Sequence, residues 1–252
     1  MDDSWACSAA YVYALHLNPS GRAWEYLRRN PRYQRDWAHH HRSASQHVAA
    51  RWGLATLIDP RLDARQVVPV WTNGAPWLVT LVRNEIGHAP TALDGVGRLS
   101  LWRLVGRKSL VEERGVTRLI VHSSAKWVQV RLGRKLRQGD PFAYQIPAVA
   151  DERAVWAAVT EFRGLMLAGR GLVPQPGRPG RTDVFHIRAL QVLDGLAAGA
   201  TQRQLAKAIF GTVAADRSWQ PDGALRAQLR YLVRKSKALM EGDYRSLVSS
   251  AG

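Results

Sequence analysis

The sequence predicts an α+β protein with a helical N-terminal unit, a small antiparallel β-rich middle and a C-terminal three-helix domain of helix-turn-helix type. Aromatic and apolar residues recur at helical spacing before residue 52. Five short runs rich in β-branched and aromatic residues lie between residues 67 and 146. Helical patterns separated by glycine return after residue 182. We therefore divide the chain into residues 1–52, 53–150, 151–181 and 182–252.

The first part is predicted to hold three helices. An apolar run over residues 9–17 ends at the Asn-Pro pair at 18–19, and a second helix ends at the Asn-Pro pair at 30–31. A third helix is expected over residues 32–52. The core of this unit is expected to contain Trp5, Trp24, Trp37 and Trp52.

The middle part is predicted to form a small antiparallel sheet or an open barrel. Residues 67–71 and 77–82 flank an Asn-Gly turn signal and are expected to pair. Residues 117–122 and 127–132 form a second expected pair, and residues 142–146 a fifth strand. With five short strands, a small antiparallel sheet or open barrel is the simplest architecture.

A helix and a linker follow the strands. Residues 151–167 have helical spacing, with Asp151 as a possible cap and with Val155, Trp156 and Phe162 on one apolar face. Residues 169–181 are rich in glycine and proline, a composition typical of a linker.

Three helices are predicted after the linker. The first is capped by Thr182 or Asp183 and ends at Gly199. A short helix covers residues 202–210, and a longer one covers residues 224–240. Two helices joined by a tight glycine turn have the outline of a helix-turn-helix.

The charge of the chain favours a polyanionic partner. There are 36 lysines and arginines against 20 aspartates and glutamates, which gives a formal net charge of +16. Double-stranded DNA is the partner we expect, although free use of arginine by a GC-rich genome would give the same excess. An acidic N-terminus and the lack of a long apolar run predict a cytoplasmic protein without membrane contact.

The expected DNA-binding residues lie on the last two of these helices. On the helix over residues 224–240, four cations share one flank that no acidic residue interrupts. Such a flank suits binding to a phosphate backbone or in a major groove. The alternative is that the flank is only solvated. The start of the helix over residues 202–210 offers backbone N–H groups to phosphate. We expect base contacts from Arg226 and Arg230 and phosphate contacts from Arg203, Lys207 and Lys237. The full predicted set is Thr201, Gln202, Arg203, Lys207, Arg226, Arg230, Arg234 and Lys237.

Signatures of enzymes and metal sites are weak. Histidines at 39–41 and 47 have no acidic or cysteine partner at matching spacing, so we expect no metal site. Nucleotide-binding loops and hydrolase motifs are missing from the sequence, so we expect no cofactor and no enzymatic activity. A second basic cluster could follow a DNA backbone or be merely solvated; it consists of Arg131, Arg134, Lys135 and Arg137.

Two stretches carry a family resemblance. Residues 24–33, followed by Asp36 and Trp37, resemble the transcriptional regulator-like domain of proteobacterial integrative and conjugative elements. Residues 193–211, with Trp219 and residues 232–247, resemble the DNA-binding domain shared with RovC, an activator of type VI secretion genes. A chain with both in this order is similar to the FseA-type activators of excision.

The resemblance implies a transcriptional activator of excision or transfer genes on a mobile element. It also implies a small antiactivator protein and RNA polymerase as partners. We expect a homo-oligomer, because paired half-sites raise the specificity of small basic modules. Two alternatives stay open from the residues alone: a protein-interaction adaptor or antiactivator, and an enzyme that processes nucleic acid.

Overall fold

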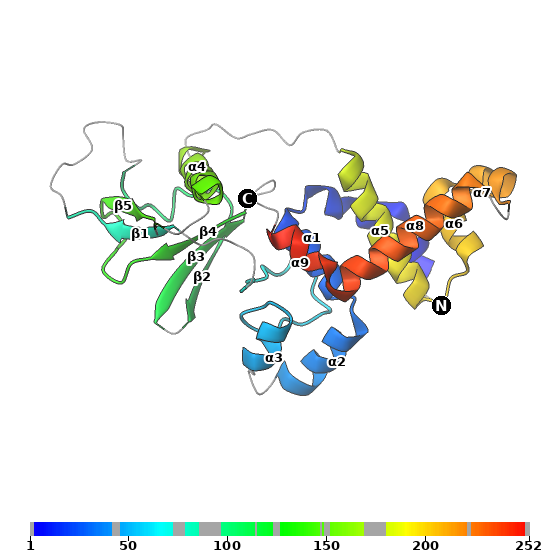
Figure 1. Cartoon of the computed structure of the whole chain (residues 1–252), viewed down its shortest axis with the longest axis horizontal. Helices are drawn as coiled ribbons and strands as arrows, with labels where there is room; N and C mark the ends of the chain where they lie inside the picture. Colours follow the sequence, from blue (N-terminus) through cyan, green and yellow to red (C-terminus); the bar gives the residue numbers. More distant parts are fainter. Residues whose placement is uncertain are drawn as a thin grey trace. The chain divides into compact units, whose positions relative to one another are not determined.

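A computed structural model describes residues 3–41, 46–72, 79–85, 97–113, 115–122, 127–146, 148, 152–168, 180–220 and 223–249. It confirms an α+β protein with helices at both ends of the chain and a sheet in the middle (Figure 1). Contacts group residues 1–71 and 177–248 into one compact unit, and residues 72–176 with 249–252 into a second. The N-terminal and C-terminal helices therefore share the first unit.

The described residues of the N-terminal part of the first unit include the helical segments η1 (Asp3–Ala6), η2 (Ser8–His16), α1 (Pro19–Leu27), α2 (Pro31–His40) and α3 (Gln46–Arg51). The Asn-Pro pairs begin helices as well as separating them, because each asparagine is an N-cap and each proline the first helical residue. The expected first helix is a 3₁₀ helix, η2. The expected helix over 32–52 is wrong as a single element, since α2 and α3 divide it around residues 42–45, which lie outside the description.

Aromatic rings pack edge to face in the core of this part. The ring centroid of Tyr33 lies 5.6 Å from that of Trp24 and 5.7 Å from that of Trp52. Trp5 is buried as well, as predicted. Trp37 is not a core residue; it stays partly exposed and stacks on His41 at 4.4 Å.

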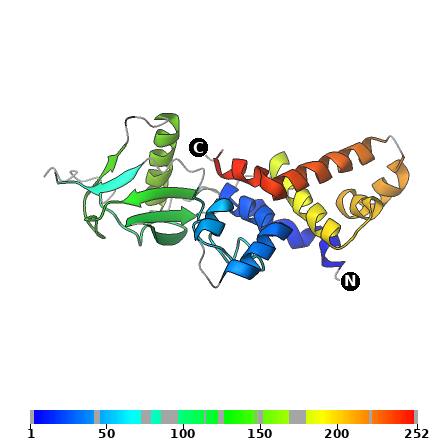
Figure 2. The ribbon, with the colours of Figure 1, turned by 60° about the horizontal axis from the view of Figure 1, so that its bottom comes forward.

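The C-terminal part of the first unit holds α5 (Arg181–Ala197), α6 (Gln202–Phe210), α7 (Thr212–Ser218), α8 (Ala224–Ala238), the π-helical turn η4 (Leu239–Asp243) and α9 (Tyr244–Ser249). Figure 2 shows α5 and α8 side by side, with α6 and α7 near the start of α8. The N-cap of α5 is Gly180 rather than Thr182 or Asp183. The Asp183 carboxylate instead accepts the N–H of Gly180 at 2.7 Å. Helix α7 was not predicted; it starts directly after Gly211, whose φ of 91° turns the chain between α6 and α7.

The second unit contains a five-stranded sheet: β1 (Thr80–Arg83), β2 (Arg107–Glu113), β3 (Val116–His122), β4 (Trp127–Leu132) and β5 (Phe142–Gln145). The strand order is β2-β3-β4-β1-β5, and β1 runs parallel to β4 while the other neighbours are antiparallel. The predicted pairing of residues 117–122 with 127–132 is confirmed, and so is the strand within 142–146.

Two features of the sheet differ from the prediction. Residues 67–71 form no strand and belong to the first unit, where Trp71 makes an isolated bridge to Leu54. The fifth strand of the sheet is instead the edge strand β2. It was not predicted because four of its seven residues are charged, as is common at sheet edges. The turn expected at residues 73–74 lies outside the described residues.

Helix α4 (Glu152–Ala168) covers one face of this sheet (Figure 1). Its residues Val155, Val159 and Phe162 are buried in one cluster with Leu119 and Val130 of the sheet. Trp156 was expected on the same face, but its side chain is 60% exposed. The expected cap Asp151 and most of the expected linker, residues 169–179, lie outside the described residues.

Candidate nucleic-acid interface

A tight turn joins α5 to α6. Gly199 has a φ of +79°, a backbone conformation that L side chains rarely adopt. The Thr201 hydroxyl accepts the N–H of Gln204 at 3.3 Å, and the Gln204 side chain accepts the N–H of Thr201 at 2.8 Å. This capping box fixes the start of α6. The inward face of α6 is the predicted one, with Leu205, Ala206 and Ile209 buried.

Gly195 lets three segments meet closely. A Cβ added at this position would lie 2.5 Å from Cδ2 of Leu205 on α6 and 2.8 Å from the ring of Trp5 in η1. Any side chain here would push α5 away from both neighbours. The close crossing of α5 and α6 that the sequence analysis assigned to Ala206 therefore depends on Gly195 as well.

The exposed face of α8 carries charge of one sign. Leu229, Leu232 and Ser236 turn inward and are buried. Arg230, Arg234, Lys235 and Lys237 are exposed, and within the described part of the chain none of these four side chains pairs with a carboxylate. The structure thus places Arg230, Arg234 and Lys237 on one solvent-facing flank, as the helical spacing predicted.

Two arginines of α8 are held against aromatic rings. The guanidinium of Arg226 lies 5.4 Å from the ring centroid of Trp219, and no described residue accepts a hydrogen bond from its buried Nε. The guanidinium of Arg234 lies 5.6 Å from the ring centroid of Tyr231. Such contacts orient a cation without cancelling its charge. Arg226 is thus the least accessible of the four predicted cations on α8, and Arg230 reaches solvent directly.

The two cations of α6 share one carboxylate. Nη2 of Arg203 lies 3.1 Å and Nζ of Lys207 lies 3.0 Å from Oδ1 of Asp216 on α7. The hydrogen bond from Lys207, with a further one from Arg203, holds the pKa of Asp216 below its ordinary value. All three side chains reach solvent, where a phosphate can compete with the carboxylate. Gln202 is exposed in the first turn of the same helix.

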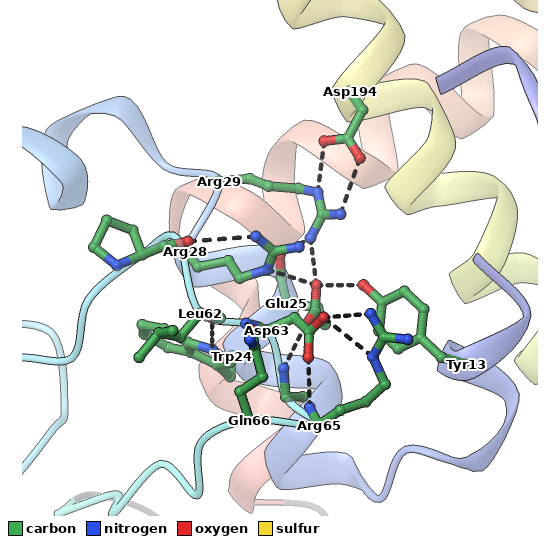
Figure 3. A network of polar contacts seen from close by, with 12 residues as sticks. Tyr13, Trp24, Glu25, Arg28, Arg29, Leu62, Asp63, Arg65, Gln66 and Asp194 are labelled. Atoms are coloured by element: carbon green, nitrogen blue, oxygen red, sulfur yellow. Dashed lines mark hydrogen bonds and ion pairs between the residues drawn. The ribbon is translucent and has the colours of Figure 1, made fainter. Parts of the chain in front are cut away.

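A buried ion network joins the N-terminal helices to α5 (Figure 3). Glu25 on α1 is fully buried and accepts hydrogen bonds from Arg28 Nε at 2.7 Å, Arg29 Nη1 at 2.6 Å and the Tyr13 hydroxyl at 2.7 Å. The backbone N–H of Ala64 donates to its other oxygen at 2.8 Å. Burial opposes ionisation of Glu25, but the neighbouring guanidiniums outweigh it and keep its pKa below the ordinary value.

Arg29 extends this network to the C-terminal helices. Its Nε and Nη2 donate to the two oxygens of Asp194 on α5 at 2.7 and 2.9 Å, a bidentate pair. The Tyr11 hydroxyl donates to the same carboxylate at 2.8 Å. One guanidinium therefore connects α1 with a residue 165 positions further along the chain.

Further contacts fix the two parts of this unit to each other. The Tyr26 hydroxyl lies 2.8 Å from Nδ1 of the buried His186 on α5. The Asn30 side chain donates to the carbonyl of Met240 at 2.9 Å, and the Tyr244 hydroxyl donates to the carbonyl of residue 52 at 2.9 Å. Several residues that carried the family resemblance are therefore the ones that hold the α5–α8 helices on the N-terminal helices. This role was not predicted from the sequence, because no local pattern connects partners so far apart.

The remaining candidates belong to other segments of the chain. His39 and His41 each lie within hydrogen-bond distance of a carbonyl of their own helix, and the described residues include no group of three or more side chains suited to a metal ion. The second basic cluster belongs to the other unit, where Arg131 lies in β4 and Arg134, Lys135 and Arg137 are exposed after it. No helix among the described residues has the length and apolar character to cross a membrane.

Comparison with known families matches two segments of the chain. Residues 146–249 match the family described as the T6SS transcription factor DNA-binding domain, the RovC type. Residues 4–55 match the proteobacterial transcriptional regulator-like domain. A search of curated proteins found no match. The first match contains all eight predicted DNA-binding residues, and the two matches together support a DNA-binding transcription regulator.

Proposed function

We propose that this protein is a sequence-specific transcription activator of the excision or transfer genes of an integrative and conjugative element. Both matched families are described as transcription regulators, and they occur here in the order that the resemblance implies. The observation that carries the DNA-binding part is the exposed flank of α8, whose charged residues are all arginine or lysine and which lies within the matched DNA-binding segment.

The contacts can be divided by their position on the helices. Arg230 lies in the first half of α8 and is exposed, so it is the residue we assign to base edges, where an arginine binds guanine with two hydrogen bonds. Arg234 and Lys237 continue the same flank toward phosphates. Arg203 and Lys207 would leave Asp216 to bind a neighbouring phosphate. Arg226 keeps its predicted base contact, now with Trp219 orienting it.

The ion network gives this surface a rigid support. The bidentate pair between Arg29 and Asp194, together with the Tyr26–His186 contact, fixes α5, against which α8 packs. A recognition surface held in this way loses less entropy when it binds. The N-terminal helices therefore act, in this proposal, as the base on which the DNA-binding helices are mounted.

The proposal extends to the partners. The protein would act at bacterial DNA as a homo-oligomer on paired half-sites, would contact RNA polymerase, and would be open to control by a small antiactivator. It would act by binding alone, without metal, cofactor or catalysis.

Fluorescence anisotropy with duplexes from the upstream regions of the element that carries the gene tests the proposal. We expect a site bound at least about 10³-fold tighter than scrambled duplex at physiological salt. Replacing Arg230 by glutamine should weaken that site by about 1–3 kcal/mol and relax its sequence preference. Arg32→Gln, an exposed arginine on α2, is the matched control and should change neither.

A transcription reporter tests the sign of regulation. Transcription from the bound promoter should rise with the protein and stay at background with Arg230→Gln. Equal, salt-sensitive binding to all duplexes would contradict the proposal and would favour an adaptor that uses protein contacts instead.

A further inference from the structure

An open groove lies between α5 and α8. Its walls are formed by Val184 and Phe185 of α5, Phe210 at the end of α6, and Tyr231 and Leu232 of α8. Its volume is about 650 Å³, within the range of small-molecule sites. Val184 and Tyr231 remain 38% and 50% exposed, so apolar surface faces solvent here.

Two arginines stand at this apolar surface. Arg181 and Arg188 both line the groove and both are exposed. The guanidinium of Arg188 lies 5.5 Å from the ring centroid of Phe210, so it is held at the apolar wall. In the part of the chain that the structure describes, neither arginine pairs with a carboxylate, and none of the lining residues is acidic.

We propose that this groove binds a small amphipathic carboxylate, with the apolar part between the aromatic rings and the carboxylate on Arg188 and Arg181. Three aromatic rings and a leucine favour a ligand with an apolar part, while two arginines that pair with no carboxylate in the described part of the chain favour an anionic head group. The Gln228 side chain, also in the lining, can donate to the same carboxylate.

The groove is connected to the basic flank of α8 through one aromatic ring. Tyr231 lines the groove, and the guanidinium of Arg234 lies over that ring. A ligand that packs against Tyr231 restricts its side chain and with it the position of Arg234. Ligand binding therefore changes DNA affinity, a part of the inference that rests on the proposed function.

Calorimetric titration with decanoate, below its micelle concentration and without DNA, tests the site itself. Ala227 lines the groove and is exposed, so Ala227→Phe fills the groove without entering the core. We expect Ala227→Phe and Arg188→Gln each to lower the affinity for decanoate by about tenfold or more. Arg32→Gln should leave this affinity unchanged. Decan-1-ol, which has the same chain without the charge, should bind more weakly to the unmodified protein and be insensitive to Arg188→Gln.

DNA anisotropy with and without decanoate then tests the coupling. Decanoate should shift the DNA affinity of the unmodified protein severalfold and leave that of Ala227→Phe unchanged. Equal decanoate binding by all variants, or none at all, would overturn the proposal. Arg188→Gln could instead weaken DNA binding in the absence of decanoate and bind decanoate as the unmodified protein does. The arginine would then belong to the DNA contact, and the groove site would be refuted. The protein could also bind decanoate, lose that binding in Ala227→Phe, and show no specific DNA binding. This result would support the groove site and refute only the proposed function and the coupling.

Discussion

Stability between pH 7 and pH 5 should depend on His186. This imidazole is 4% exposed on α5 and contacts the Tyr26 hydroxyl. Burial, and after it the charge of Arg22, lowers its pKa from 6.5 to about 4, although Asp183 opposes the shift. Below pH 6.5 the unfolded chain therefore binds a proton at this histidine that the folded chain does not bind, and falling pH favours unfolding.

The size of the effect follows from the two pKa values. Between pH 7 and pH 5 the difference in proton binding costs about 2 kcal/mol of unfolding free energy, at about 1.4 kcal/mol for each pH unit. The loss approaches about 3 kcal/mol near pH 4, where folded His186 begins to accept a proton.

Urea unfolding of the protein and of His186→Asn at pH 5, 6 and 7 measures this term. The variant loses some stability at every pH, but the pH-dependent part at residue 186 disappears from it. The difference between the two proteins should therefore shrink by about 2 kcal/mol from pH 7 to pH 5. Parallel loss of stability in both proteins would refute the assignment of a buried, neutral histidine.

Two further substitutions test the packing of the first unit. Arg29→Met should lower the free energy of unfolding, measured with urea, by about 3 kcal/mol, because it leaves the buried Glu25 with fewer donors and Asp194 without its bidentate partner. The exposed Arg32→Met is the control. A loss below about 1 kcal/mol for Arg29→Met, close to that of Arg32→Met, would contradict the network. Gly195→Ala should lower the free energy of unfolding by about 1–3 kcal/mol in thermal unfolding, because the added methyl group meets α6 and η1. The matched change Gly164→Ala on α4, which has open space around it, should instead raise the free energy of unfolding by up to about 1 kcal/mol. Equal behaviour of the two variants would show that α5 and α6 do not cross as described.

Elements with strong local patterns were predictable from the sequence. The helices at 202–210 and 224–240 and the strand pair at 117–122 and 127–132 follow from periodicity and end signals within ten to twenty residues. The exposed flank of α8 follows in the same way, because helical geometry alone decides which residues share a face.

Elements and contacts that depend on distant residues were not predictable. Strand β2 is charged and gains its place only by pairing with β3. Neither Arg29 nor Asp194 shows in its own segment that the other is its partner. The contact of Arg226 with Trp219 depends on the path of the chain between α7 and α8, which residue spacing does not determine.

DNA affinities of Arg230→Gln and Arg32→Gln test most directly whether the flank of α8 reads DNA. Both variants are measured on the bound promoter site and on scrambled duplex, at several salt concentrations. Both variants remove one exposed positive charge, so a general effect of net charge would change them equally. We predict that only Arg230→Gln loses affinity for the site, by about 1–3 kcal/mol, and with it the preference over scrambled duplex. Equal affinities of the two variants for both duplexes would contradict it.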